Sequence, residues 1–206
     1  MTHQLHIVYS GKPLEQAQKA LIMLHGRGAD AESILSLSRL LNVADYALLA
    51  PQATNQTWYP RSFLAPVTEN EPWLSSALNI VDQTLETVLK SGIKIENVYI
   101  LGFSQGACLT LEFVARNARK YGGIVAFTGG LIGDRIEREN YKGDFDQTPV
   151  FIGTSNPDFH VPVERVYASA DILQEMNASV TEKVYTNRGH TISEDEIEQV
   201  NRIILT

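Results

Sequence analysis

Short apolar runs rich in β-forming residues alternate along this chain with amphipathic stretches of helical period. This alternation is typical of an α/β protein with a mainly parallel central sheet, in which a helix carries the chain back between successive strands. Several runs are apolar at consecutive positions, as expected of strands covered by helices on both faces. The expected strands are Leu5–Tyr9, Ala20–Leu24, Tyr46–Ala50, Val98–Leu101, Gly123–Phe127, Val150–Gly153 and Val180–Tyr185.

Helices are expected between these strands. Apolar residues at helical spacing predict them at Ala31–Leu41, Pro72–Lys90 and Val163–Met176. The last helix has an N-terminal signature, because Ser193 and Glu196 have the spacing of a capping box. No repeat, linker or low-complexity segment interrupts the pattern, so residues 1–206 are expected to form a single domain.

Composition narrows the function classes. With 44% hydrophobic and 20% charged residues the chain has the balance of a globular protein, and a net charge of -7 argues against nucleic acid or an anionic membrane as partner. No apolar run approaches the roughly 18 residues of a membrane-spanning helix, so no membrane insertion is expected. A single cysteine and an N-terminus without signal-peptide character favour a cytoplasmic location.

The pentapeptide GFSQG, residues 102–106, joins the strand Val98–Leu101 to an amphipathic helix. It fits the G-x-S-x-G nucleophile elbow, in which a serine occupies a sharp strand-to-helix turn. Glycines are needed there because side chains at the flanking positions would collide with the neighbouring strand and helix. The serine hydroxyl then stands clear of the sheet, close to the free N–H groups at the start of the helix. We therefore predict that Ser104 is a nucleophile.

A serine hydroxyl is a weak nucleophile at neutral pH, so a base and an orienting acid are expected after it. In this architecture they follow in the order serine, acid, histidine. His190 fits the base, because it lies in a loop between a strand and the capped last helix. Asp158 fits the acid, because it follows the strand Val150–Gly153 at the edge where catalytic side chains gather. His160 is too close to Asp158 to be its partner and is expected at the surface or rim.

The segment LIMLHGRGAD, residues 21–30, predicts the other half of the site: a buried strand, a glycine-rich loop and then a helix. In the nucleophile-elbow architecture this loop supplies one N–H group of an oxyanion hole. The expected donors are the backbone N–H groups of Arg27 and Gln105. We interpret His25 as a structural residue that braces the loop.

The segment Gln52–Glu71 has no clear secondary structure, and long loops in compact domains are often functional. Its aromatic residues are expected to form an apolar substrate-binding wall: Trp58, Tyr59 and Phe63, with Trp73 as a further candidate. Arg61 lies in the same segment. Together with Arg27 it would favour a substrate that carries a carboxylate or a phosphate.

The remaining cysteine and histidines are interpreted as structural. Cys108, on the helix after the nucleophile, is expected to be a small buried core residue rather than a reactive thiol. His3 and His6 alternate along an expected strand and would face opposite sides, so no metal site is expected there.

Four motifs in this order resemble the phospholipase/carboxylesterase family of α/β-hydrolases, which includes the acyl-protein thioesterases: LHGRGAD, GFSQGACL, DFHVP from Asp158, and GH ending at His190. The similarity spans nearly the whole chain, and HGRGA resembles the small bacterial esterases of the family. It implies the α/β-hydrolase fold, no cofactor, and Ser104, Asp158 and His190 as a catalytic triad. Arg27 stands where members commonly have an apolar residue, and WYPRSFLAP replaces the lid-like segment of the thioesterases.

The function expected from these features is that of a carboxylesterase-type serine hydrolase acting on small-molecule esters, with thioesters as a further substrate class. Two alternatives stay open: a lactone or dienelactone-type hydrolase, and a low-turnover ligand-binding module on a hydrolase fold. No metal or cofactor is expected. A homodimer is compatible with this kind of protein, although the sequence indicates no interface.

Overall fold

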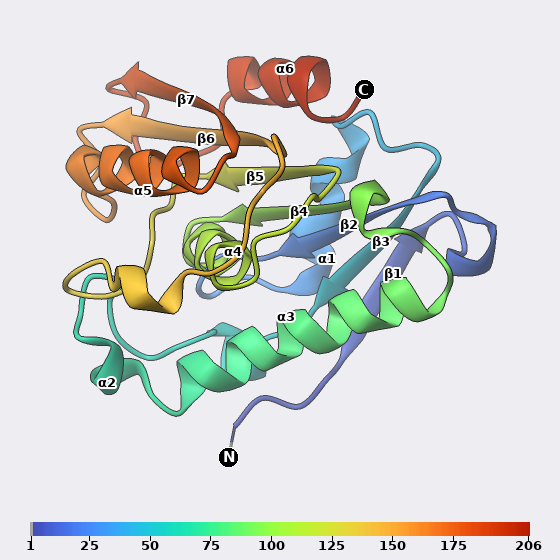
Figure 1. Cartoon of the computed structure of the whole chain (residues 1–206), viewed down its shortest axis with the longest axis horizontal. Helices are drawn as coiled ribbons and strands as arrows, with labels where there is room; N and C mark the ends of the chain where they lie inside the picture. Colours follow the sequence, from blue (N-terminus) through green and yellow to red (C-terminus); the bar gives the residue numbers. More distant parts are fainter. Residues whose placement is uncertain (1) are drawn as a thin grey trace.

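The computed structural model describes residues 2–206, and within this range seven strands form one sheet (Figure 1). Their order across the sheet is β1-β3-β2-β4-β5-β6-β7. The edge strand β1 pairs antiparallel with β3, and the other neighbouring pairs are parallel. The bounds are Ile7–Gly11 (β1), Lys19–Leu24 (β2), Tyr46–Pro51 (β3), Val98–Phe103 (β4), Gly123–Phe127 (β5), Pro149–Asn156 (β6) and Ser179–Thr186 (β7). The predicted mainly parallel sheet is confirmed.

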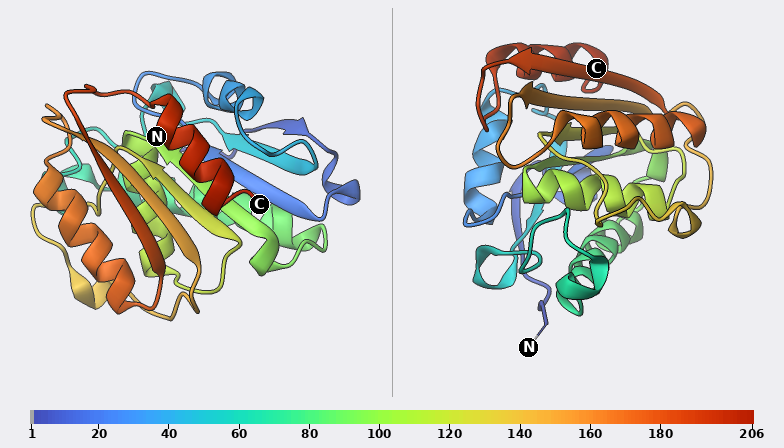
Figure 2. Two further views of the ribbon diagram at one scale, coloured as in Figure 1. Left: turned by 90° about the horizontal axis from the view of Figure 1, so that it is seen from above. Right: turned by 90° about the vertical axis from the view of Figure 1, so that its left-hand side faces the viewer.

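Helices cover both faces of this sheet, as expected (Figures 1 and 2). Their bounds are Ala31–Leu35 (α1), Val67–Asn70 (α2), Trp73–Lys90 (α3), Gln105–Arg116 (α4), Val163–Glu175 (α5) and Glu194–Ile203 (α6). One hydrophobic core joins α3, α4 and α5 to one face, and a second joins α1 and α6 to the other. Along the central strands, successive side chains point into the two cores in turn: Ile100 packs in the first core and Leu101 in the second.

Three elements depart most from the sequence-based expectation, and the ends of the others shift by at most two residues. The first strand begins at Ile7 rather than Leu5. His3 and His6 therefore precede this strand, and the expectation that they alternate along it is wrong. The helix expected at Ala31–Leu41 ends at Leu35 and is followed by a 3-10 turn over Ser36–Arg39. There the Ser36 hydroxyl donates to the Ser33 carbonyl oxygen, which illustrates how serine competes for backbone groups in a helix. The sixth strand continues to Asn156, because its pairing with β7 extends to Thr186.

The last helix begins as its sequence predicts. Ser193 accepts a hydrogen bond from the Glu196 N–H group, and the Glu196 carboxylate accepts one from the Ser193 N–H group. The apolar stripe of this helix, Ile197, Val200 and Ile204, is buried against the sheet. This anchored helix fixes the end of the loop that contains His190.

The parallel strands bring their carboxyl ends to one edge of the sheet, and the arrowheads of β4, β5, β6 and β7 point to the same side in Figure 1. The loops that follow β2, β4, β6 and β7 therefore meet there. The segment Gln52–Glu71 follows β3 at this edge and contains the 3-10 turn Thr54–Gln56 and the short helix α2. Within residues 2–206, no helix has both the length and the apolar character to cross a membrane.

Candidate active site

Ser104 lies at the junction of β4 and α4, in a backbone conformation that L-residues rarely adopt. Its φ is 54° and its ψ is -118°. The Ser104 N–H group donates to the Phe127 carbonyl oxygen of β5 at 2.9 Å, which holds the turn against the sheet. Such a conformation costs of order 1–3 kcal/mol and persists only where its surroundings enforce it. The turn aims the hydroxyl away from the sheet.

The flanking glycines have the steric role that the motif predicts. A Cβ at Gly102 would lie 2.2 Å from the Gly106 carbonyl oxygen. A Cβ at Gly106 would lie 2.2 Å from the Leu24 carbonyl oxygen of β2. Since real Cβ atoms do not approach backbone oxygens so closely, the elbow can pack between strand and helix only with glycine at both positions.

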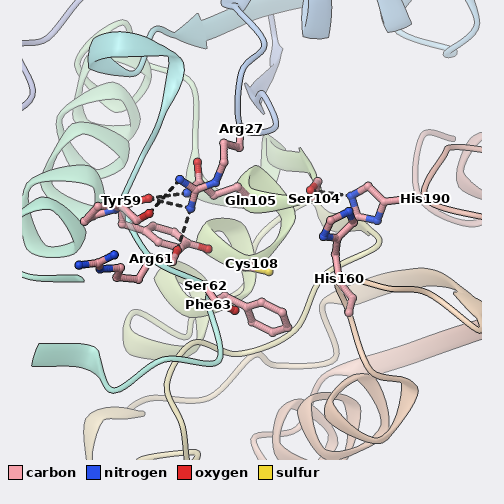
Figure 3. A pocket seen from close by; sticks show the side chains of 12 residues that line it. Arg27, Tyr59, Arg61, Ser62, Phe63, Ser104, Gln105, Cys108, His160 and His190 are labelled. Carbon is pink, nitrogen blue, oxygen red and sulfur yellow. Dashed lines mark hydrogen bonds between the residues drawn. The ribbon is translucent and has the colours of Figure 1, made fainter. Parts of the chain in front are cut away.

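The side chains of Asp158, His190 and Ser104 form a continuous hydrogen-bonded chain. His190 Nδ1 lies 2.8 Å from Asp158 Oδ2. On the other side of the ring, His190 Nε2 lies 2.7 Å from Ser104 Oγ (Figure 3). An ionised carboxylate can only accept, so Nδ1 carries the ring proton of a neutral imidazole and Nε2 is free to accept the hydroxyl proton. The structure therefore brings together the three residues that the sequence places in separate loops.

Asp158 is held as a buried, ionised carboxylate. Its side chain is fully buried, and Oδ1 accepts the backbone N–H groups of His160 at 2.7 Å and Val161 at 3.0 Å. Burial acts to raise the pKa of this carboxyl, but the His160 N–H group, the His190 ring and the Val161 N–H group outweigh it and lower the pKa. Asp158 thus stays charged beside His190 and fixes the orientation of its ring.

His160 occupies the rim of the site, where it was expected. Its side chain is exposed, and its ring meets the His190 ring edge-on at a centroid distance of 4.9 Å. The Phe103 ring contacts His190 at 5.4 Å between centroids. The imidazole of His190 is therefore held by two neighbouring rings as well as by Asp158.

Arg27, in the loop after β2, and Gln105, the first residue of α4, line the same pocket as Ser104. Their backbone N–H groups have no hydrogen-bond acceptor among residues 2–206. Gln105 N–H belongs to the first turn of a twelve-residue helix, where the backbone groups carry partial positive charge. The two N–H groups have the positions in the chain that an oxyanion hole requires.

The side chains of Arg27 and Gln105 form hydrogen bonds with the segment Gln52–Glu71, called the aromatic loop below. Gln105 Oε1 accepts the Trp58 N–H group at 2.9 Å, and Gln105 Nε2 donates to the Tyr59 carbonyl oxygen at 2.8 Å. The Arg27 guanidinium donates to the carbonyl oxygens of Tyr59, Pro60 and Arg61 at 2.9, 3.1 and 2.7 Å (Figure 3). Sequence reasoning missed this connection, because no motif links position 105 to a loop 46 residues earlier.

A pocket of about 400 Å³ opens beside Ser104. Tyr59, Arg61 and Phe63 line it as expected, together with Arg27 and the His160 ring. Trp58 does not line it, contrary to expectation. Its indole is fully buried and donates to the His25 carbonyl oxygen at 2.9 Å, which places it in the core behind the pocket.

Trp73 likewise lies outside this pocket and packs edge-on against the His3 ring at 5.0 Å between centroids. His25 braces the loop after β2, as interpreted from the sequence. Its Nδ1 lies 2.8 Å from the Gly26 carbonyl oxygen, and its Nε2 accepts the Ala53 N–H group at 3.1 Å. Burial lowers the pKa of His25, so its ring is neutral.

Cys108 is buried in α4 and contributes to the pocket wall. Burial raises the pKa of its thiol to about 12. Because only the thiolate is strongly nucleophilic, this agrees with the interpretation of Cys108 as a packing residue. Over the described part of the chain, residues 2–206, no three His, Cys, Asp or Glu side chains are grouped as metal ligands.

Comparison with known proteins decides the family. Residues 6–206 match the profile of the family described as phospholipase/carboxylesterase. The chain belongs to the phospholipase/carboxylesterase family. It is therefore a hydrolase of the carboxylesterase type, with the α/β-hydrolase fold.

Three similar proteins illustrate the breadth of this family. A probable carboxylesterase SOBER1-like of Arabidopsis thaliana is 28% identical over 200 residues, which cover 88% of this chain and 76% of that protein. Acyl-protein thioesterase 1 of Saccharomyces cerevisiae is 28% identical over 219 residues, covering 93% of each. The crystal structure of a phospholipase/carboxylesterase from Dyadobacter fermentans is 57% identical, with a TM-score of 0.99 over 100% of this chain and 99% of that one.

Proposed function

We propose that this phospholipase/carboxylesterase family member cleaves small carboxylic esters, with thioesters as a further substrate class, through an acyl-enzyme on Ser104. One observation carries the proposal: the hydrogen-bonded chain from the buried Asp158 carboxylate through His190 to the Ser104 hydroxyl. This arrangement is the one that turns a weak serine nucleophile into a strong one.

In the first half of the reaction, Ser104 Oγ attacks the carbonyl carbon while its proton passes to His190 Nε2. The imidazolium that forms is stabilised by the adjacent Asp158 carboxylate. The backbone N–H groups of Arg27 and Gln105 donate to the oxyanion of the tetrahedral intermediate, and each such donor contributes about 3 kcal/mol of transition-state stabilisation. His190 then gives the proton to the leaving alcohol oxygen or thiol sulfur, the bond to the acyl carbon breaks, and an ester on Ser104 remains.

In the second half, water attacks the acyl-enzyme. His190 Nε2 takes a proton from the water as its oxygen bonds to the acyl carbon, and the same two N–H groups hold the second oxyanion. Collapse of the intermediate breaks the bond to Ser104 Oγ, which regains the proton from His190. The carboxylic acid leaves, and the enzyme returns to its starting state.

Hydrolysis of a panel of 4-nitrophenyl esters of increasing acyl length tests this proposal. Wild type is expected to hydrolyse the short members, and Ser104→Ala is expected to lose at least 1000-fold in kcat, because removal of a triad member typically costs that much or more. Hydrolysis that continues at the wild-type rate in Ser104→Ala would refute the assignment of the nucleophile.

The two alternatives from the sequence are separated by further assays. A marked preference for cyclic over open esters of equal acyl length would favour a lactone or dienelactone-type hydrolase. Rapid labelling of Ser104 by a fluorophosphonate, without turnover of any ester, would favour a ligand-binding module. The proposed esterase both reacts with the label and turns over open-chain esters.

A further inference from the structure

The wall of the pocket carries positive charge that no acidic side chain offsets. The chain as a whole is acidic, with 24 Asp and Glu against 17 Lys and Arg. Among the residues that the structure describes, the pocket is nevertheless lined by two arginines, Arg27 and Arg61, and by no Asp or Glu. Within residues 2–206, neither arginine forms an ion pair with an acid. A pocket of this kind favours a negatively charged group.

The charge of Arg27 is fixed in position rather than carried on a mobile side chain. Three of its N–H bonds, one on Nη1 and two on Nη2, are held by the carbonyl oxygens of Tyr59, Pro60 and Arg61. A guanidinium has five N–H bonds, so those on Nε and the second on Nη1 have no acceptor within residues 2–206. Because the side chain is already ordered, an anion that binds it pays little of the usual entropy cost.

This charge lies on the acyl side of the site. The proposed mechanism requires the leaving group to lie next to His190, which protonates it, so the acyl chain must extend away from His190. Figure 3 shows Ser104 with His190 and His160 on one side and Arg27 and Tyr59 on the other. The wall around Arg27, Tyr59 and Arg61 is therefore the acyl wall.

We propose that the acyl part of the natural substrate ends in a carboxylate, so that the substrates are half-esters or half-thioesters of dicarboxylic acids. This inference rests on the proposed hydrolase function and on the acyl direction set by His190. The positive charges of Arg27 and Arg61 attract the terminal carboxylate.

The test compares the monoethyl esters of succinic, glutaric and adipic acids with the ethyl esters of the unbranched alkanoic acids of matching chain length. The expected result is a kcat/KM at least tenfold higher for one or more of the half-esters than for the neutral partner. This preference is expected to shrink when the ionic strength rises from about 0.02 to 0.5 M, because salt screens the attraction. If all three neutral esters are preferred, the inference is overturned.

Substitutions in the acyl wall test whether its arginines cause the preference for half-esters. Arg61→Gln and Arg27→Met are each expected to lower the anionic-to-neutral ratio of kcat/KM about fivefold or more. Arg39→Gln, which removes an exposed arginine of the 3-10 turn Ser36–Arg39, is the matched control and is expected to keep the wild-type ratio. Each ratio is taken within one variant, so differences in the folded fraction cancel. Wild-type ratios in both pocket arginine variants would overturn the inference.

The outcomes also separate this inference from the proposed function. If wild type hydrolyses neither ester class, or if Ser104→Ala hydrolyses both at the wild-type rate, the proposed function fails and the inference fails with it. If wild type hydrolyses the neutral esters through Ser104 and rejects the half-esters, the proposed function stands and the inference alone is overturned.

Discussion

The atoms that surround Ser104 explain why the motif GFSQG requires its two glycines and its unusual backbone conformation. The residue keeps a φ of 54° because a β5 carbonyl, the start of α4 and two close backbone approaches at Gly102 and Gly106 surround it. The sequence pattern predicts this turn, because glycine at those positions has a steric reason. It also predicts the partners of Ser104, because both follow strands whose carboxyl ends meet at one edge of a parallel sheet.

Gly106→Ala is expected to lower the free energy of unfolding by about 3 kcal/mol, because the new Cβ would lie 2.2 Å from the Leu24 carbonyl oxygen and one backbone segment must move. Urea denaturation measures the loss. Gly92→Ala is the control: its Cβ meets nothing within 4 Å, so only the cost of its φ of +95°, about 1–2 kcal/mol, is expected. Equal losses in the two variants would contradict the steric explanation.

Asp158→Asn is expected to lower kcat by about 10³- to 10⁴-fold while the protein stays folded. An asparagine cannot stabilise the His190 imidazolium, and its amide group favours the ring tautomer with the proton on Nε2, which cannot accept from Ser104. Steady-state hydrolysis of 4-nitrophenyl butyrate at pH 8 measures the effect. A loss of less than tenfold would mean that another group orients His190.

Among the elements, the loop Gln52–Glu71 is only partly predictable from its sequence. Its aromatic content predicts a wall of the site, and Tyr59 and Phe63 do line the pocket. Trp58 instead packs in the core, because Gln105 holds its N–H group and the His25 carbonyl oxygen accepts from its indole. Neighbouring aromatic residues cannot be told apart from composition when long-range hydrogen bonds decide which one faces the pocket.

Gln105→Leu tests how strongly this loop depends on the elbow. The variant leaves the Trp58 N–H group without its buried acceptor, at about 1–3 kcal/mol. It also removes one of the two hydrogen bonds to the Tyr59 carbonyl oxygen, which keeps the one from Arg27, at about 1 kcal/mol. We expect a loss of about 3 kcal/mol in the free energy of unfolding and a lower kcat/KM. Gln174→Leu, on the exposed face of α5, is expected to change stability by less than about 0.5 kcal/mol. Equal free energies of unfolding in the two variants would contradict the proposed role of Gln105 in holding this loop.

Over the whole molecule, two buried histidines connect distant segments to the aromatic loop. His3 Nδ1 accepts the Thr54 N–H group at 3.1 Å and its Nε2 lies 2.8 Å from the Trp58 carbonyl oxygen, while His25 accepts the Ala53 N–H group. Burial lowers the pKa of both rings below the usual 6.5. Each ring must stay neutral to accept its backbone N–H group.

Acid is therefore expected to destabilise the fold as the pH falls below about 6.5. Where the folded pKa is depressed, the unfolded chain binds more protons, so the free energy of unfolding falls as the pH falls. Urea denaturation at pH 8 and pH 5.5 measures this, and His25→Gln is expected to reduce the difference. A free energy of unfolding that is equal or higher at pH 5.5 would contradict the neutral-ring assignment.

The order of the strands in the sheet could not be predicted from the sequence, because an apolar run does not indicate which strands will lie next to it. The register of the edge strand shows this: Ile7 pairs with Pro51 and Gly11 with Ala47, so the β3 partner sets the strand ends rather than the run Leu5–Tyr9 itself. The fold class and the meeting of Ser104, Asp158 and His190 could be predicted, because both follow from local patterns and chain order. The connections made by Arg27 and Gln105 depend on the assembled fold.

Mass spectrometry of the protein after reaction with a fluorophosphonate tests the central assignment most directly. Wild type is expected to gain the mass of one phosphonyl group, mapped to the peptide that contains Ser104, with labelling slowed at least 100-fold in His190→Ala and abolished in Ser104→Ala. A label found on another residue, or equal labelling rates in wild type and His190→Ala, would contradict the account.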